Sequence, residues 1–394
     1  MEGWKTDKLM NLVSSITTGK LDANAMVSNG QYRFYTCAKE YYFIDNYAFD
    51  DEALMISGNG EYVGYVHYYK GKFNAYQRVY VITGFKIDVK YLQNYLNRYL
   101  PIRINKEVSQ NNIPYIRLST LSKMDIKYPE SKSEQSAIAA ILSKVDEAIT
   151  SVQASISAAE RLKKSLMQNL LTGRMKPDGT LRKDDEFYVD EKFGKVPKGW
   201  VVKAIGNKSV CQINPVYKYK KKEVYDFVPM EAVRENFGGL DFVEKQIIDN
   251  GSYTRFKAGD ILFAKITPCS ENGKVTYIDH IDSEIGFAST EFIVFHPTEN
   301  VNGQFIYLIL SSGNVHRLAI SLMEGTTGRQ RIPWKIFRNR IFVPMPDKEE
   351  QTEIVNRILA FDKKIKENNN KIAVLEKLKK SLMQNLLTGR VRIK

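Results

Sequence analysis

One thirteen-residue sequence, LKKSLMQNLLTGR, occurs twice in the chain, at 162–174 and at 378–390. The offset of 216 residues between the two copies continues backwards without a gap as far as Gln135 and Gln351. An identity of this length does not arise by chance, so the chain contains an internal repeat with a long period. We expect two halves of similar architecture, each ending in the same segment of roughly 40 residues.

Apolar residues in the repeated segment have the spacing of a coiled-coil helix, with steps that alternate between four and three residues. Each segment follows a proline (Pro129 and Pro346) and ends at a glycine suited to a helix C-terminus (Gly173 and Gly389). We predict two long helices that pack on each other, with polar Asn368 fixing their register. The predicted contact positions are Ile138, Leu142, Val145, Ile149, Val152, Ile156 and Ala159 in the first helix, and Ile354, Ile358, Phe361, Ile365, Asn368, Ile372 and Leu375 in the second.

The two helices divide the chain into domain, helix, domain and helix. Before each helix, short runs rich in β-branched and aromatic residues alternate with Gly and Asn turns, and a helical stretch follows late in each domain. We therefore predict an α+β fold, with two β-rich domains separated by two long antiparallel helices and related by internal pseudo-twofold symmetry. An alternative is that each helix dimerises independently. The predicted segments are the first domain at 1–128, the first helix at 129–174, a polar linker at 175–199, the second domain at 200–345, and the second helix with its tail at 346–394.

Charge and composition favour a polyanionic partner. The chain has 58 Lys and Arg residues against 45 Asp and Glu, a net charge of +13 at pH 7. The N-terminal sequence lacks the apolar core of a signal peptide, and no run approaches the ~18 apolar residues of a membrane span, so we expect a cytoplasmic protein without a membrane partner. Three widely separated cysteines, Cys37, Cys211 and Cys269, offer neither a disulfide framework nor a metal site.

Motifs for catalysis are missing from the sequence. There is no phosphate-binding loop, no zinc-protease motif and no nucleophile elbow, and the four histidines lack metal-ligand spacing. Asn214-Pro215-Val216-Tyr217 differs from the Asn-Pro-Pro-Tyr signature of adenine methyltransferases and has no glycine-rich cofactor loop beside it. Asp260 and Lys265 match part of a nuclease motif, but Ala264 stands where an acidic metal ligand is needed. We expect no enzyme activity and no cofactor on this chain.

Polar and basic loops in both domains have the side chains needed to bind DNA. Arg and Gln at 325–331 can read guanine and adenine edges, and the turn at 265–274 offers donors for bases or phosphates. The run YKYKKK at 217–222 suits the phosphate backbone, and the stretches at 57–61 and 70–78 are the comparable region of the first domain. The predicted DNA contacts are Asn59, Lys72, Asn74, Gln77, Arg78, Lys218, Lys220, Lys265, Thr267, Ser270, Asn272, Lys274, Thr327, Arg329, Gln330 and Arg331.

Further motifs of the second domain, together with the Leu-Leu-Thr-Gly-Arg ending of both helices, resemble the specificity subunit of type I restriction-modification systems over essentially the whole chain. The first domain departs from that pattern, with Ser57-Gly58-Asn59-Gly60 in place of Thr-Pro and no Ser-Thr-Glu-Phe. The residues that carry the resemblance are Phe256, Gly259-Asp260-Ile261-Leu262, Thr267-Pro268, Asn272-Gly273-Lys274, Ser289-Thr290-Glu291-Phe292, Gly328-Arg329-Gln330-Arg331, Pro344 and Glu350-Gln351.

The resemblance implies two target-recognition domains that read a bipartite, asymmetric site on double-stranded DNA. It also implies partners, namely two modification (methyltransferase) subunits docked on the helices, together with restriction (translocase-nuclease) subunits. S-adenosylmethionine, ATP and magnesium would then be bound by those partners. Two alternatives remain at this stage. One is a coiled-coil adaptor that binds nucleic acid without any link to restriction, and the other is an enzyme fragment whose catalytic part is not recognisable.

Overall fold

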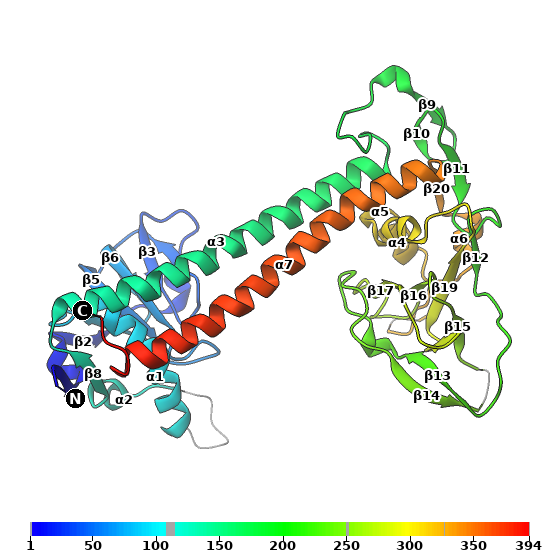
Figure 1. Cartoon of the computed structure of the whole chain (residues 1–394). Helices are drawn as coiled ribbons and strands as arrows, with labels where there is room; N and C mark the ends of the chain where they lie inside the picture. Colours follow the sequence, from blue (N-terminus) through cyan, green and yellow to red (C-terminus); the bar gives the residue numbers. More distant parts are fainter. Residues whose placement is uncertain (1, 108–114, 250–251, 327, 394) are drawn as a thin grey trace. The chain divides into compact units, whose positions relative to one another are not determined.

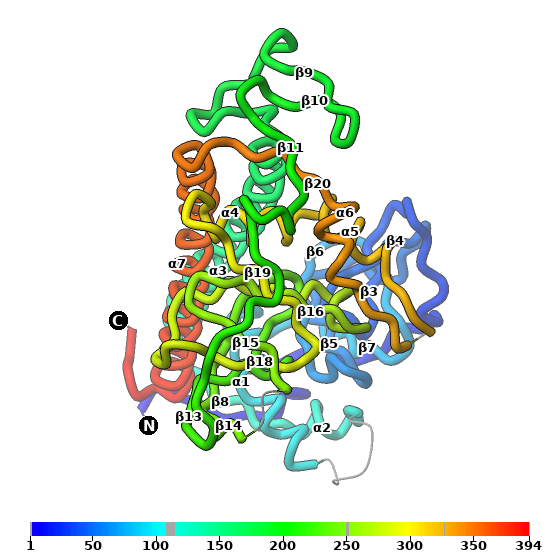
Figure 2. The backbone as a smooth tube through the Cα atoms, turned by 90° about the vertical axis from the view of Figure 1, so that its right-hand side faces the viewer, coloured from blue at the N-terminus to red at the C-terminus, as the bar shows by residue number. Residues whose placement is uncertain are grey.

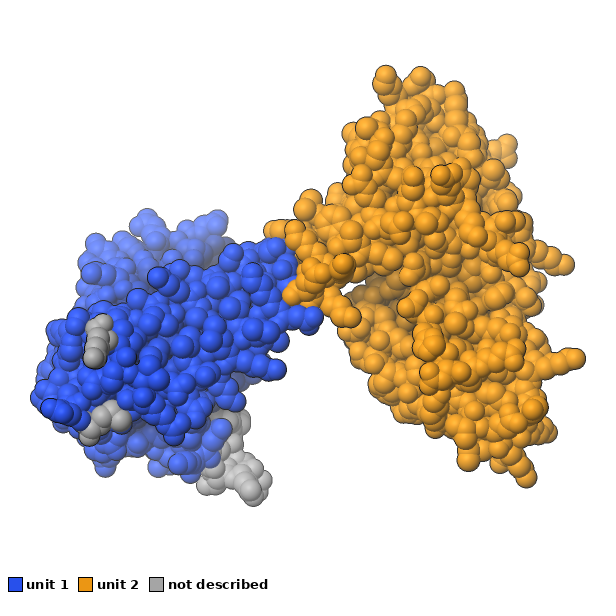
Figure 3. All heavy atoms as spheres, in the orientation of Figure 1, with its two compact units in different colours: residues 1–155, 368–394 blue, residues 156–367 orange. Residues whose placement is uncertain are grey.

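The computed structural model describes residues 2–107, 115–249, 252–326 and 328–393. The chain forms two compact units, with residues 1–155 and 368–394 in unit 1 and residues 156–367 in unit 2 (Figure 3). Two long helices dominate the fold, α3 (Lys132–Leu171) and α7 (Lys348–Leu386) (Figure 1). Each unit contains one domain, the beginning of one long helix and the end of the other. The compact units therefore differ from the segments predicted from sequence, because both helices are shared between them.

In the described part of unit 1, six strands form one sheet in the order β2-β7-β5-β6-β3-β4. Only β3 and β6 are parallel neighbours, and β1 pairs with β8 outside this sheet. The strands are β1 (Trp4–Lys8), β2 (Ser15–Thr18), β3 (Tyr32–Tyr35), β4 (Tyr42–Ile44), β5 (Phe49–Ser57), β6 (Val66–Ala75), β7 (Val79–Thr83) and β8 (Asp125–Pro129), and the shorter helices are α1 (Val89–Glu107) and α2 (Leu118–Ser122).

In the described part of unit 2, two four-stranded sheets have the orders β12-β19-β16-β17 and β14-β13-β18-β15. β11 pairs with β20 outside these sheets, as β1 pairs with β8 in unit 1. The strands are β11 (Val201–Ala204), β12 (Cys211–Ile213), β13 (Glu223–Val228), β14 (Glu244–Ile248), β15 (Thr254–Phe256), β16 (Ile261–Ala264), β17 (Val275–Tyr277), β18 (Gly286–Ala288), β19 (Phe292–Pro297) and β20 (Phe342–Met345), with helices α4 (Gly303–Ser311), α5 (Gly313–Ser321) and α6 (Ile336–Asn339).

The two domains share one strand topology. β12 and β19 pair as β2 and β7 do, and β13 lies between antiparallel β14 and parallel β18 as β3 lies between β4 and β6. The difference is in the middle, where β15 and β16 replace the single strand β5, and β17 and β18 replace β6. Equivalent positions in the two domains are therefore defined by backbone pairing, which holds where sequence similarity is weak. These features confirm the α+β class.

Residues 175–199, predicted as a polar linker, contain an antiparallel hairpin of β9 (Phe187–Asp190) and β10 (Gly194–Pro197). Its turn is stabilised by the Asp190 carboxylate, which accepts hydrogen bonds from the backbone N–H groups of Lys192 and Phe193. Residues 62–64 form a turn, and β6 begins at Val66.

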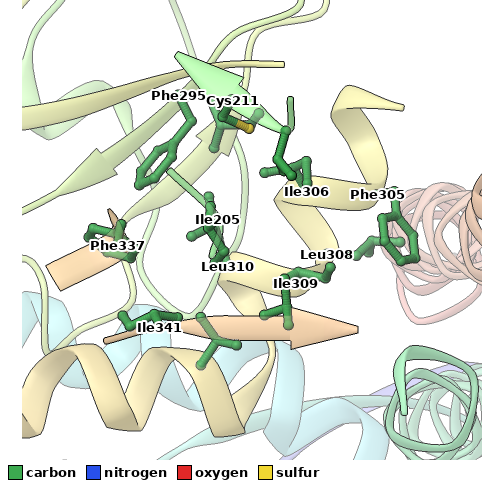
Figure 4. Close-up of a cluster of buried hydrophobic side chains, with 14 of the residues drawn as sticks. Ile205, Cys211, Phe295, Phe305, Ile306, Leu308, Ile309, Leu310, Phe337 and Ile341 are labelled. Atoms are coloured by element: carbon green, nitrogen blue, oxygen red, sulfur yellow. The ribbon is translucent and has the colours of Figure 1, made fainter. Parts of the chain in front are cut away.

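The repeated helix ends pack into the hydrophobic cores. Leu386 and Leu387 are buried in the unit 1 core with Trp4. Leu170 is buried with Trp200 in unit 2, in the core that contains the α4 side chains of Figure 4. The glycine that follows has a positive φ, 69° at Gly173 and 74° at its counterpart in the second copy, as the predicted helix caps require. Much of the sequence identity between the two copies is therefore explained by their equivalent packing in the two cores.

Cross-helix contacts confirm that α3 and α7 are antiparallel neighbours. In unit 1, Lys379 Nζ lies 2.6 Å from Asp146 Oδ1, and in unit 2 the equivalent pair Lys163 and Asp362 is joined in the same way. Asn368 Nδ2 donates to Ser155 Oγ across the helices at 3.3 Å. The seam positions predicted from the heptad spacing are buried or half-buried. Asn368 therefore contributes a polar cross-helix contact to an otherwise apolar seam.

A buried glutamine joins each long helix to its domain. Gln135 Nε2 donates to the Pro129 carbonyl at 2.7 Å, and its Oε1 accepts from Asp88 N at 2.7 Å, at the start of α1. Gln351 makes the same two bonds in unit 2, to the Pro346 carbonyl at 2.9 Å and from Asn302 N at 2.9 Å. Because both glutamines are buried and fully engaged, each helix start is held firmly on its domain.

The two ends of the described chain lie side by side in unit 1, as Figure 2 shows. Arg392 Nη1 donates to the Glu2 carbonyl at 3.0 Å, next to the β1–β8 pair. The segment after α7 is therefore a packed part of unit 1.

Candidate nucleic-acid interface

In the second domain, the predicted loop at 325–331 and the predicted turn at 265–274 lie against each other. Thr267 N donates to the Gln330 carbonyl at 3.1 Å, and Ile332 N donates to the Lys265 carbonyl at 2.8 Å. The backbones of Arg331 and Glu324 also pair as an isolated antiparallel β-bridge across the base of the loop. Two segments far apart in the sequence thus form one surface, and backbone hydrogen bonds fix its shape.

Arg331 is held by an acidic neighbour that the sequence did not identify as a contact residue. Its Nε lies 3.0 Å from Glu291 Oε2 and its Nη2 lies 2.9 Å from Glu291 Oε1, a two-point arrangement. The hydrogen bonds from Arg331 hold the pKa of Glu291 below its ordinary value. One edge of the guanidinium is therefore occupied in the free protein. Glu291 was visible in the sequence only as part of the Ser-Thr-Glu-Phe motif.

Several other predicted residues of this domain stabilise the turn. Ser270 is buried, and its hydroxyl faces the Met323 sulfur, so its side chain is not exposed to DNA. Asn272 Nδ2 donates to Glu235 Oε1 at 2.8 Å, and Lys274 Nζ donates to a main-chain carbonyl at 3.0 Å. In addition, Lys265 Nζ donates to the Thr290 carbonyl at 2.7 Å, while the Thr267 hydroxyl is buried.

The exposed predicted residues of the second domain are Arg329, Arg331, Lys218 and Lys220, with Gln330 half-exposed. Thr327 lies outside the described residues.

In the first domain, the structure brings together two of the five predicted residues. Gly58 N donates to the Arg78 carbonyl at 2.9 Å, and Asn59 is bridged to Tyr115. Ile116 N donates to the Gly58 carbonyl at 2.7 Å, which completes a crossing of three segments. Asn59 and Arg78 therefore lie at one place, together with the exposed side chain of Tyr115.

The remaining three predicted residues of the first domain lie along β6 and the turn after it. Asn74 is buried and donates from Nδ2 to Asn46 Oδ1 at 2.8 Å, so its side chain is not accessible to DNA. Lys72 is exposed, with Nζ 4.6 Å from the ring centroid of Tyr47, and Gln77 is also exposed.

A group of tyrosines around Arg33 was missed by the sequence reasoning. The Arg33 guanidinium lies between the rings of Tyr41 and Tyr69, 4.3 and 4.4 Å from their centroids. Nη1 also donates to Tyr35 Oη at 3.5 Å, and these tyrosines raise the pKa of Arg33. The run of aromatic residues at 41–43 was the available signal, but the partner ring on β6 becomes adjacent only through the sheet.

Among the described residues, no group of three or more His, Cys, Asp or Glu side chains is placed to hold a metal ion. No helix in that part of the chain is long and apolar enough to cross a membrane. Asn214, from the segment compared with methyltransferases, accepts a hydrogen bond from Val294 N at 2.9 Å and so supports a strand edge.

The family model described as the type I restriction modification DNA specificity domain matches residues 1–161 and 197–377. The chain belongs to this family. Its members recognise the DNA target in type I restriction-modification systems and are not catalytic. The specificity assignment made from sequence is therefore confirmed, and the interpretation as an enzyme fragment is excluded.

Other type I specificity subunits are similar to this chain, in one case over nearly its whole length and in another over less than half of it. The EcoDI specificity subunit of Escherichia coli is 28% identical, over 98% of this chain and 88% of that protein. The EcoEI specificity subunit of the same organism is 34% identical over 42% of this chain and 28% of its own length. The alignment with EcoDI thus includes both domains and both helices.

Solved structures show the same fold. The S subunit from M. genitalium superposes with a TM-score of 0.59 at 16% identity, covering 97% of this chain and 96% of that one. A chain from a study of complex assembly and conformational transition of the type I R-M system has a TM-score of 0.57 at 13% identity, with 98% coverage of both chains.

Proposed function

We propose that this specificity subunit reads a bipartite, asymmetric DNA site, with one half-site read by each domain, while it is bound to two modification subunits. The observation that supports the proposal is that the two halves of the repeat share their backbone architecture but differ in their exposed loops. Most of the strand pairing and the attachment of the long helices are the same in both halves. The exposed loops differ in length and charge, as expected if each domain reads a different sequence.

The duplicated helix ends support two copies of one partner. Leu162 and Leu378 occupy the same position in the repeat and are both exposed, by 60% and 46%. Exposed residues do not take part in core packing, so the packing of the helix ends does not explain why they are identical. An identical surface presented twice suits a single kind of protein bound at two places. Within 160–174 and 376–390, the other positions that are identical and exposed in both copies are Glu160 and Glu376, Lys164 and Lys380, Ser165 and Ser381, Gln168 and Gln384, and Arg174 and Arg390.

The chemistry of the complex then belongs to the partners. Modification subunits supply S-adenosylmethionine and methylate adenine, and restriction subunits supply ATP-driven translocation and cleavage with magnesium. This chain provides sequence choice and the spacing between the half-sites. It acts in the cytoplasm, where the host DNA is.

Competition binding tests the proposal. The purified complex of this chain with its modification subunits is bound to a labelled duplex carrying the modified site, at a fixed salt concentration. Random duplex DNA and RNA are then added as competitors. We expect the specific duplex to compete at least about 1,000-fold better than random duplex, and RNA to compete no better than random duplex. Equal competition by random DNA or by RNA would contradict sequence-specific recognition and favour a general nucleic-acid adaptor.

A further inference from the structure

We propose that Arg78, Tyr115 and Arg117 form the surface with which the first domain reads bases in its half-site. This inference rests on the proposed function, in which each domain reads one half-site. It assigns a recognition surface to the domain whose sequence departs from the family pattern. Two of these residues, Tyr115 and Arg117, were not among the contacts predicted from sequence.

Backbone pairing shows that the same crossing of three segments is built in both domains. In the second domain, Lys265 N donates to the Glu291 carbonyl at 2.9 Å, and Ile332 N donates to the Lys265 carbonyl at 2.8 Å. Ile266 is bridged to Arg331 at the same place. The first domain has the two equivalent hydrogen bonds, from Gly58 N at 2.9 Å and from Ile116 N at 2.7 Å, and the equivalent backbone bridge between Asn59 and Tyr115.

The equivalences follow directly from these bonds. Gly58 corresponds to Lys265 and Asn59 to Ile266, because each makes the same backbone contacts. Arg78 then corresponds to Glu291, since both directly precede the strand that leads away from the crossing, β7 in one domain and β19 in the other.

Tyr115 corresponds to Arg331, and the buried isoleucines that follow them are also equivalent.

The charge is reversed at one pair of equivalent positions, and at the other pair a neutral residue of the first domain corresponds to a charged one of the second. The second domain has a carboxylate at Glu291 and a guanidinium at Arg331, which neutralise each other. The first domain has a guanidinium at Arg78 and a phenol at Tyr115. In the described part of the chain, Arg78 forms no ion pair, and its side chain is exposed. At these two positions the first domain therefore presents hydrogen-bond donors, whereas the second domain presents an acceptor, Glu291, next to a donor, Arg331.

Arg117 adds a second guanidinium to the first surface, and Tyr115 orients it. Arg117 Nε and Nη2 both donate to the Tyr115 hydroxyl oxygen, at 3.1 and 2.6 Å. Both side chains are exposed, and the Tyr115 side chain is 49% accessible. A guanidinium held by a neighbouring ring loses less side-chain entropy on binding than a free one.

The base of this surface is rigid. Ile116 is buried between Tyr115 and Arg117, and its carbonyl accepts a hydrogen bond from Tyr80 Oη at 2.9 Å. The Tyr80 hydroxyl is protonated at neutral pH, as in any tyrosine, and burial raises its pKa further. The exposed residues on either side of Ile116 are therefore displayed from a fixed backbone, as direct readout requires.

The chemistry of the surface indicates what it reads. Neither Arg78 nor Arg117 forms an ion pair among the described residues, and their guanidinium groups are suited to the O6 and N7 acceptors of guanine in the major groove. The first half-site should therefore contain at least one guanine whose recognition depends on Arg78 or Arg117.

The test uses the full complex with modification subunits and maps methylated adenines for the wild type, Arg78→Ala, Arg117→Ala and Arg329→Ala. Arg329→Ala is the matched control, because it removes an exposed arginine from the loop of the second domain. We expect Arg78→Ala or Arg117→Ala to reduce discrimination at one guanine of one half-site by roughly 5- to 150-fold. Arg329→Ala should leave that half-site unchanged.

Competition with duplexes that carry single base changes gives the same comparison in vitro, and thermal unfolding checks that each variant is folded. If both first-domain variants keep the wild-type preference, or weaken binding equally for all sequences, the inference is wrong while the bipartite function stands. If the wild-type complex itself methylates no two-part site, the proposed function fails.

Discussion

The Arg392 guanidinium holds the Glu134 carboxylate at two points, with Nε 2.7 Å from Oε1 and Nη2 2.8 Å from Oε2. Glu134 lies in the first turn of α3, and Arg392 lies just beyond the end of α7. In unit 2 the pattern recurs, because Glu350 at the start of α7 pairs with Arg182, which follows α3. In each unit, therefore, an ion pair joins the start of one long helix to the segment that follows the other.

Replacing Arg392 should loosen unit 1. In Arg392→Ala the buried Glu134 loses both charge-assisted hydrogen bonds, which we expect to destabilise the end of α7 only modestly because the arginine itself is partly solvent-exposed. Hydrogen exchange in the last turns of α7 measures the effect. The exchange rate of Arg392→Lys should lie between those of the wild type and Arg392→Ala, since an ammonium cannot form the two-point contact. Wild-type protection in the alanine variant would contradict this role.

The two equivalent tryptophans should respond differently to replacement by phenylalanine. Trp200 Nε1 donates to Glu350 Oε2 at 2.8 Å, whereas the buried Trp4 Nε1 has no hydrogen-bond partner in the described structure. Trp200→Phe removes a charged hydrogen bond, while Trp4→Phe removes an unsatisfied donor. We expect Trp200→Phe to destabilise its unit by about 2 kcal/mol more than Trp4→Phe destabilises its own. Denaturant unfolding followed by hydrogen exchange in each unit gives the comparison, and equal losses would rule the explanation out.

The duplicated exposed leucines should control partner binding. Leu162→Asp or Leu378→Asp places a charge on one of two identical surfaces, so each single variant should retain one modification subunit and the double variant none. Val374→Asp is the control, because Val374 is 64% exposed on α7 but has alanine, Ala158, at its counterpart in the first copy. The mass of the purified complex reports the stoichiometry. Full assembly by the double variant would place the docking surface elsewhere.

Helix length should set the gap between half-sites. Seven residues inserted in α3 after Ser155 and seven in α7 before Asn368 keep the heptad seam in register. The insertion lengthens the helix pair by about 10 Å, which corresponds to about three base pairs. We expect methylation mapping to show both half-sites unchanged with a spacer longer by about that amount. An altered half-site with an unchanged spacer would contradict the proposed role of the helices.

The repeat and the helices were predictable because their determinants are local. Heptad spacing, the capping glycines and the constant offset of 216 residues all act within one helix or between its two copies. The burial of Leu170 and Leu386 also follows from that pattern. The hairpin at 187–197 was missed because its strands have only four residues each and because its turn depends on the Asp190 carboxylate.

The candidate surfaces were only partly predictable, since strand pairing brings distant residues together. Arg331 and Glu291 are adjacent through the crossing of three segments, which no spacing rule reveals. The constant offset of the helices does not relate Gly58 to Lys265, because loops of different length separate the strands of the two domains. Asn74 and Ser270 were proposed as contacts for their chemistry, but both are buried.

Bipartite recognition is tested most directly by a map of methylated adenines in DNA from cells that express this chain with its modification subunits. If each domain reads its own half-site, the map should show one sequence motif made of two different specified blocks, separated by a fixed number of unspecified base pairs. A single continuous motif, or methylation without sequence preference, would contradict bipartite recognition.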